Sequence, residues 1–162
     1  MNLRNAKNLD FEAIFEIINT NYQRYGDCVW LEGYDNDLVD TESSYSGKNG
    51  SFMVLEDKGS IIGTHATQPI DISKGQLTFR RLYVKAEYHG SEAGKLLFDW
   101  AMNWTAEKKF KRVEFWSDTR YERAHSFFKK YGFINSGEIQ HLNDAPLPFS
   151  EYKFYYDVPS FS

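Results

Sequence analysis

Hydrophobic and polar residues along the chain follow two periods, one typical of helices and the other typical of strands. Apolar side chains recur at helical spacing over residues 11–18, after Asn8, whose side chain suits a helix N-cap. The same spacing predicts amphipathic helices over 93–107 and 121–131. Residues 37–45 are expected to form a short helix within an irregular, acid-rich segment.

Segments rich in β-branched and aromatic residues predict strands between these helices. The expected strands cover residues 2–6, 51–56, 60–70, 76–84, 112–116, 134–141 and 151–158. The turn DKG between the second and third predicts a hairpin. This order predicts an α/β (α+β) fold with a mixed, mostly antiparallel sheet of six to seven strands and helices on both faces. With no repeat, linker or second core, residues 1–162 are expected to form a single domain.

The strand predicted over 76–84 contains an irregularity. Leu77 and Phe79 are apolar at odd positions, whereas Leu82 and Val84 are apolar at even positions. A change of phase at Arg80–Arg81 predicts a β-bulge, and bulges occur frequently beside active sites.

Composition narrows the class of protein. Hydrophobic residues make up 41% and charged residues 26% of the chain, which excludes a disordered protein. The net charge of −4 argues against nucleic acid as the main partner. No apolar run approaches the roughly 18 residues of a membrane span, and the N-terminus has no signal-peptide pattern. The single cysteine cannot form an internal disulfide and the four histidines are scattered, so we expect a cytoplasmic protein without a metal site.

The segment RLYVKAEYHGSEAGKLLFDWA (81–101) combines a strand, a short glycine-containing turn and a helix. Such a turn directs several backbone N–H groups and the positive end of a helix toward one point, which suits a pyrophosphate. On these residues alone, the alternative is that Gly90 and Gly94 only permit a tight turn and close packing.

At these residues the sequence resembles the GNAT superfamily of acyl-CoA-dependent N-acetyltransferases. Its fingerprint, V-x-P-x-Y-[RQ]-G-x-G-x-[GA]-x-x-L-L, is matched by Val84, Tyr88, Gly90, Gly94 and Leu97, with His89 in place of Arg or Gln. The segment WSDTRYERAHSFFKKYGF resembles a second family element at Ala124, Phe127, Gly132 and Phe133. The start of this segment is also similar in sequence to a bacterial branch of the family whose substrate is unknown. The resemblance covers residues 76–134.

The resemblance implies an acetyl-CoA site on the strand, the turn and the second helix. It assigns the pantetheine arm to the backbone of Leu82, Tyr83 and Val84, and it adds Phe128 to the cofactor-binding residues. It assigns the pyrophosphate to the amides of His89, Gly90, Ser91, Ala93, Gly94 and Lys95.

Two departures from the family pattern bear on activity. Glu92 stands where the family has Gly, and a carboxylate there would repel a phosphate unless it points outward. Phe128 stands where many members have the Tyr that protonates the leaving thiolate. Tyr121 is the candidate replacement and His125 a second one; the alternative is that Tyr121 packs at the helix start and His125 is a half-buried polar group.

The base that deprotonates the amine has several candidates. Glu114 lies midway along a strand predicted to be buried; the alternative is an ion pair with Arg80, Arg81 or Arg112. An acid-rich loop lies where the family builds its acceptor pocket, and the alternative is a solvated loop; its acids are Glu32, Asp35, Asp37 and Asp40. His65 either faces the same pocket or is a satisfied core histidine.

These features predict an N-acetyltransferase that moves an acetyl group from acetyl-CoA to a primary amine of a small molecule or protein by direct attack in a ternary complex. The acid-rich loop favours a cationic acceptor. No membrane or nucleic-acid partner is expected, and the last strand is a candidate edge for a homodimer. The alternatives are another acyl donor or an amino-acid acceptor, a degenerate GNAT domain that binds CoA or a partner without catalysis, and an aromatic-rich interaction module.

Overall fold

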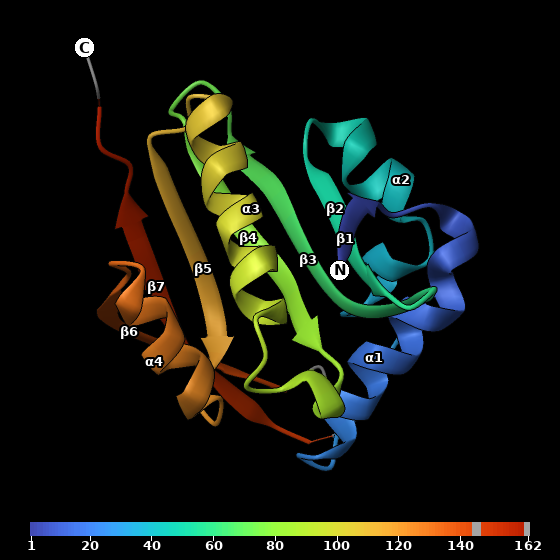
Figure 1. Ribbon diagram of the computed structural model, residues 1–162. Helices are drawn as coiled ribbons and strands as arrows, with labels where there is room; N and C mark the ends of the chain where they lie inside the picture. Colours follow the sequence, from blue (N-terminus) through green and yellow to red (C-terminus); the bar gives the residue numbers. More distant parts are fainter. Residues whose placement is uncertain (144–146, 161–162) are drawn as a thin grey trace.

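The computed structural model describes residues 1–143 and 147–160, which form a seven-stranded mixed sheet (Figure 1). In spatial order the strands are β1 (Asn2–Asn5), β2 (Ser51–Asp57), β3 (Ser60–Asp71), β4 (Gln76–Val84), β5 (Arg112–Asp118), β7 (Phe149–Asp157) and β6 (Ile134–Leu142). All neighbouring strands are antiparallel except β4 and β5. The expected mixed, mostly antiparallel sheet is confirmed.

Helices cover both faces of this sheet, as expected (Figure 1). The α-helices are α1 (Phe11–Gln23), α2 (Thr41–Ser44), α3 (Ala93–Glu107) and α4 (Glu122–Lys130). Helix α1 packs on one face, where its buried Ile14, Ile17 and Ile18 join the core, and α3 and α4 pack on the other. No helix of the described residues has the length and apolar character that crossing a bilayer requires.

The short connecting helices differ most from expectation. The helix expected over 37–45 is divided into a 3-10 turn at Asn36–Leu38 and the single turn of α2, where the Asp40 side chain accepts from Ser43 N–H. The first helix extends beyond residue 18 to Gln23. Propensity and spacing set where these segments begin, whereas tertiary contacts decide how far the helix continues.

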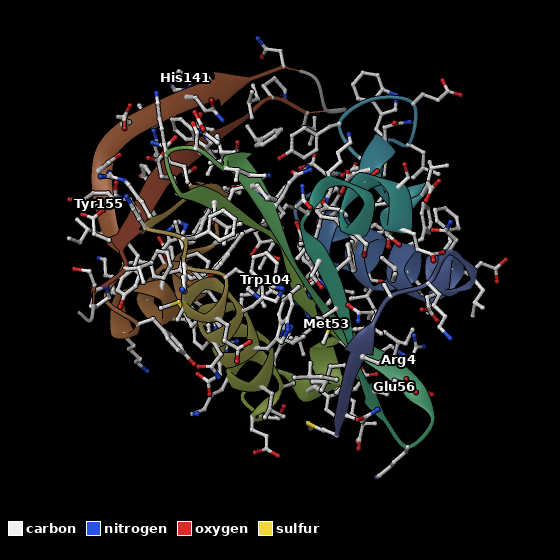
Figure 2. All side chains as sticks on the ribbon, turned by 90° about the horizontal axis from the view of Figure 1, so that it is seen from above. Arg4, Met53, Glu56, Trp104, His141 and Tyr155 are labelled. Atoms are coloured by element: carbon white, nitrogen blue, oxygen red, sulfur yellow. The ribbon has the colours of Figure 1, made fainter. Side chains whose placement is uncertain are left out.

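An edge contact holds β1 against β2. Arg4 of β1 and Glu56 of β2 point toward one another and form an ion pair (Figure 2). The same guanidinium binds both oxygens of Asp10, at 2.8 and 2.9 Å, just before α1. These contacts join the start of the chain to the sheet and fix where α1 begins.

The β-bulge expected at Arg80–Arg81 is confirmed. Arg81 has a φ of +62°, and the register of β4 against β3 shifts between the pairs Ala66–Arg80 and Thr64–Tyr83. Thr64 Oγ1 donates to the Arg81 carbonyl at 2.7 Å, which holds the bulged backbone in place. The bulge turns the Arg81 side chain into the interior, where it is 6% exposed.

The parallel strands β4 and β5 separate soon after they begin. They pair only at Gln76–Arg112 and Leu77–Val113, and Figure 1 shows their carboxyl ends diverging. Among the described residues, the edge of β4 that faces β5 therefore has no strand partner beyond Leu77. This separation positions the site described next.

Candidate active site

A cleft of about 1080 Å³, including its open mouth, lies where β4 and β5 separate. Its floor is apolar and includes Phe79, Phe98 and Phe115 of the core. Its walls come from the loop after α1 and from the residues around the start of α4, including Tyr34 and Tyr121. The fold thus joins segments distant in sequence around one cavity.

The turn between β4 and α3 presents free amides to open space. Gly90 has a φ of +81°, and a Cβ at Gly90 or Gly94 would meet no atom within 4 Å. Within residues 1–143 and 147–160, the amides of Gly90, Gly94 and Lys95 have no hydrogen-bond acceptor. Free amides at a helix N-terminus favour an anion such as a phosphate.

Three of the other amides assigned to the pyrophosphate are used within the turn itself. His89 N–H donates to Ala86 O and Ser91 N–H to Tyr88 O, each at 3.1 Å. Ala93 N–H donates to Ser91 Oγ at 3.2 Å. These bonds shape the turn, so Gly90, Gly94 and Lys95 are the assigned amides that remain available to a ligand.

Glu92 occupies the N-cap position of α3 with an exposed side chain. A carboxylate there is favoured by the positive end of the helix dipole. The outward-pointing alternative considered for this residue agrees with its exposure. The negative charge nevertheless stands directly before the free amides.

The free edge of β4 carries the backbone groups of Leu82 and Val84. Lys85 N–H donates to Ile62 O at 2.8 Å, so by the alternation of an antiparallel pair the backbone of Tyr83 also faces β3, whereas the backbone groups of Leu82 and Val84 point to the free edge of β4. Leu82 and Tyr83 line the cavity, whereas Val84 is not among its lining residues. His89 Nε2 lies 3.0 Å from the Val84 carbonyl oxygen and covers that acceptor.

The bulged Arg81 binds two carboxylates of the loop after α1. Its Nη1 lies 2.8 Å from Asp35 Oδ1, and its Nε and Nη2 lie 3.0 and 2.5 Å from the two oxygens of Asp37. Burial alone would raise the pKa of Asp37, but Arg81 outweighs it and holds that pKa below its usual value. Asp35 and Asp37 are therefore interior ion-pair partners of Arg81 and not members of a solvated loop, because the bulge places a cation among them.

Three tyrosines line the cleft beside this network, Tyr22, Tyr83 and Tyr121. Tyr22 Oη donates to Asp35 Oδ1 at 2.9 Å and accepts from Arg81 Nη1 at 3.0 Å. The ring of Tyr83 packs edge to face against that of Tyr22, with the ring centroids 5.9 Å apart, and burial raises the pKa of Tyr83. Burial, the largest cause, raises the pKa of Tyr121 above its usual value, so its phenol is neutral at physiological pH.

Phe128 and the two histidines lie against the apolar floor. Phe128 is 6% exposed and packs on Phe98 and Phe115. His65 is buried with Nδ1 3.2 Å from Leu97 O, and burial lowers its pKa to about 4, so it is a neutral core histidine at the floor of the cleft. His125 lies with Nε2 3.2 Å from Ser117 Oγ, and burial lowers its pKa.

Glu114 lies apart from the cleft. Its carboxylate oxygens lie 3.1 Å from Arg112 Nε and 3.1 Å from Lys153 Nζ, as the ion-pair alternative with Arg112 anticipated. It is not among the residues that line the cavity.

Two carboxylates that the sequence did not single out line it, Asp118 and Glu151, together with Asp27, at which the acid-rich segment begins. Glu151 is 6% exposed and accepts from Gln140 Nε2 at 2.8 Å, and Arg120 joins Asp27 to Asp118. The one feature of the sequence that could have indicated such a residue was the position of Glu151, a carboxylate at the start of a strand rich in aromatic residues.

Comparisons with known proteins agree with this geometry. The model of the acetyltransferase (GNAT) domain family matches residues 48–135. N-acetyltransferase family 8 member 2 of Rattus norvegicus is 26% identical over 128 residues, which are 76% of this chain and 57% of the rat protein. The chain thus spans little more than half the length of that relative.

Solved structures share the whole fold. A GNAT-family acetyltransferase of Staphylococcus aureus superposes with a TM-score of 0.80 at 18% identity, over 96% of this chain and 98% of that one. A phosphinothricin acetyltransferase of Sinorhizobium meliloti, solved in complex with acetyl-CoA, superposes with a TM-score of 0.77 at 16% identity, over 97% and 88% of the two chains.

The family match extends from β2 to the start of β6 and so includes the bulge, the turn with its free amides and the parting of β4 from β5. These are the features from which the cleft is built. The chain belongs to the GNAT acetyltransferase family.

Proposed function

We propose that this protein transfers an acetyl group from acetyl-CoA to a primary amine by direct attack within a ternary complex. The observation that carries the proposal is that a free strand edge and free amides occur on consecutive elements. The edge of β4 at Leu82 and Val84 has no strand partner among the described residues, and the turn that follows β4 leads to the free amides of Gly94 and Lys95.

These residues fit acetyl-CoA in chemistry as well as in position. The amides of Gly94 and Lys95 would hold the pyrophosphate, and the edge of β4 would pair with the amide groups of the pantetheine arm. Bound there, acetyl-CoA supplies a thioester as the electrophile. Holding an amine and a thioester in contact accounts for a large part of the acceleration in such a transfer.

The chain offers two groups for the charge that develops during acyl transfer. The Leu82 N–H, directly after the bulge, faces the cleft and suits the developing oxyanion. Phe128 has no hydroxyl and so is unable to protonate the leaving thiolate. Tyr121 takes over this role, because Tyr121 lines the cleft and its neutral hydroxyl is able to donate a proton to a thiolate. Glu114 is held by Arg112 and Lys153 outside the cavity, so in this scheme it is replaced by Glu151, a buried carboxylate that lines the cleft.

The acceptor side favours a cationic amine. The cleft is lined by four carboxylates, Asp27, Asp35, Asp118 and Glu151, against two cations, Arg80 and Arg81. An excess of negative charge concentrates ammonium groups and steers them inward. The aromatic mouth, with Trp30 and Tyr34 both about two-fifths exposed, would contact the body of the amine. The single, exposed cysteine is compatible with a cytoplasmic location.

Thiol release from acetyl-CoA in the presence of an amine panel tests this function. Spermidine, tyramine and a lysine-containing peptide represent cationic acceptors, and glutamate represents an anionic one. We expect thiol release that depends on a cationic amine and weakens at high salt. Binding of acetyl-CoA without release for any amine would instead favour the degenerate GNAT domain that Glu92 and Phe128 suggest.

A further inference from the structure

Exposed aromatic rings gather in the cleft. Among the described residues, the three most exposed aromatic side chains are Trp30, Tyr34 and Trp116, at 43, 40 and 37%, and all three line this one cavity. Trp30 and Tyr34 belong to the loop after α1 and Trp116 to β5, so the tertiary structure brings them together. Exposed apolar side chains that gather in one groove indicate a surface that binds a ligand.

Trp30 is held in place although its ring is exposed. Its N–H donates to Asp35 Oδ2 at 2.9 Å, and its carbonyl oxygen accepts from the N–H groups of Gly33 and Asp35 at 3.2 and 3.0 Å. The ring lies against the backbone of Gly33, where a Cβ would come within 2.6 Å of it. Because Arg81 fixes Asp35 in the interior, the Trp30 ring is a preorganised stacking surface that loses little freedom when a ligand binds.

The other two rings also have neighbours that support them. Tyr34 packs edge to face on Phe149, with the ring centroids 6.2 Å apart, and Arg81 Cζ lies 5.8 Å from the centroid of the Tyr34 ring. Lys153 Nζ lies 5.8 Å from the centroid of the Trp116 ring. Aromatic rings held in this way favour another aromatic ring over an alkyl group of the same size, because their faces and edges carry opposite partial charges.

A carboxylate lies deeper in the cleft than these rings. Glu151 is 6% exposed and stands directly across from Asp118 in the pairing of β5 with β7. Tyr121 N–H donates to the Asp118 carbonyl oxygen at 3.1 Å, so Glu151 lies near the start of α4, where Tyr121 lines the cleft. An amino group held by Glu151 would therefore lie deep, beside the hydroxyl proposed for the chemistry, and the body of the acceptor would extend toward the exposed rings.

The charges of the cleft favour an acceptor with a single amino group. Arg81 binds Asp35. Arg120 binds both Asp27 and Asp118. Arginines thus compensate three of the four carboxylates that line the cavity. A polyamine would bring further ammonium groups to carboxylates that are already bound.

We propose that the acceptor is an arylalkylamine, in which a short alkyl chain joins one amino group to a flat aromatic ring. Trp30, Tyr34 and Trp116 contact the ring of the acceptor, and Glu151 receives its amino group. This inference rests on the proposed acetyl transfer and specifies the acceptor of that reaction.

Phenethylamine and cyclohexylethylamine test the inference, because they differ in aromatic character while their size and charge are nearly the same. We expect the wild type to use phenethylamine with a kcat/KM about 3- to 10-fold higher, with the difference mainly in KM. Spermidine should be a poorer acceptor than phenethylamine.

Variants at the cleft identify the groups responsible. Trp30→Leu should raise the KM for phenethylamine about 3- to 10-fold and leave the KM for cyclohexylethylamine and acetyl-CoA within about twofold, whereas Trp30→Phe should keep the preference. Tyr34→Leu should act in the same direction as Trp30→Leu. Glu151→Gln should instead raise the KM of both amines alike, since it receives the amino group that they share.

Trp104→Leu is the matched control, because it also removes an indole ring, one that stacks on Phe110 outside the cleft. Its preference for phenethylamine should match the wild type. Equal use of the two amines by the wild type, better use of spermidine or of a lysine-containing peptide, or a preference unchanged in Trp30→Leu would overturn the inference while acetyl transfer stands. A wild type inert toward every amine would overturn the proposed function and the inference with it.

Discussion

The guanidinium of Arg81 lies 2.8 Å from Asp35 across the interior, although 46 positions separate the two residues in sequence. This contact joins the bulge of β4 to the loop after α1 and so fixes one wall of the cleft to its floor. Both side chains are almost fully buried. An ion pair at the surface contributes about 0–1 kcal/mol to stability. The buried Arg81–Asp35 pair also constrains the geometry of the cleft, and removing one partner would leave an uncompensated charge in the interior.

Loss of this pair should destabilise the fold. We expect Asp35→Ala to lower the free energy of unfolding by about 3 kcal/mol, because it leaves a buried cation with one carboxylate in place of two. Asp157→Ala is the control: Asp157 forms an exposed ion pair with Arg112 at 3.4 Å, and its loss should change stability by less than about 0.5 kcal/mol. Urea denaturation measures both, and equal effects would contradict the role assigned to Arg81.

Acetyl-CoA should stabilise the folded protein through the turn before α3. At about 100 times its dissociation constant, it should add about 2.7 kcal/mol, which corresponds to a rise in Tm of about 5–10 °C. Gly94→Glu should abolish the shift, because its side chain would enter the space that is open in front of the amides. Thermal denaturation with and without acetyl-CoA gives the answer. An unchanged wild-type Tm at millimolar ligand would exclude this turn as its binding site.

Glu92 should weaken binding of acetyl-CoA by charge repulsion. We expect Glu92→Gln to lower the dissociation constant several-fold at low salt, with the difference shrinking as ionic strength rises. Glu87→Gln supplies the control, since Glu87 is also exposed and lies five residues earlier in a 3-10 turn. Calorimetric titration distinguishes them. If the two variants bind alike, the carboxylate of Glu92 points away from the pyrophosphate.

His65 should make stability depend on pH in a defined window. Its pKa is about 4 in the folded protein and about 6.5 unfolded, so the unfolded chain binds the extra proton first as the pH falls. The stabilisation is complete above pH 6.5 and is lost toward pH 4, by about 2–3 kcal/mol. His125, whose pKa is also lowered, adds to the loss in the same direction.

The variant His65→Gln isolates this contribution. Its amide is able to donate to the Leu97 carbonyl and does not titrate. Urea denaturation at pH 7.5 and 4.5 should show a smaller loss for the variant than for the wild type. Equal losses would mean that His65 does not remain neutral in the fold.

Local sequence patterns determined the secondary structure of this protein and the position of its β-bulge. Hydrophobic periodicity fixed the strands and the main helices, because a single period decides which face of an element is apolar. The change of phase at Arg80–Arg81 located the bulge for the same reason. The glycine-containing turn before α3 was also visible, since its geometry depends on consecutive residues.

Contacts between distant segments were decided only by the tertiary structure. Asp35 is able to lie in the interior because it forms an ion pair with Arg81. Glu151 reaches the cleft because β7 lies beside β5. Glu114 shares a side of β5 with Trp116 and Asp118, which line the cleft, but it lies nearer the start of the strand, where Arg112 and Lys153 bind its carboxylate. A charged side chain acquires its role from the charges and cavities packed against it, and these come from parts of the chain whose proximity no local pattern records.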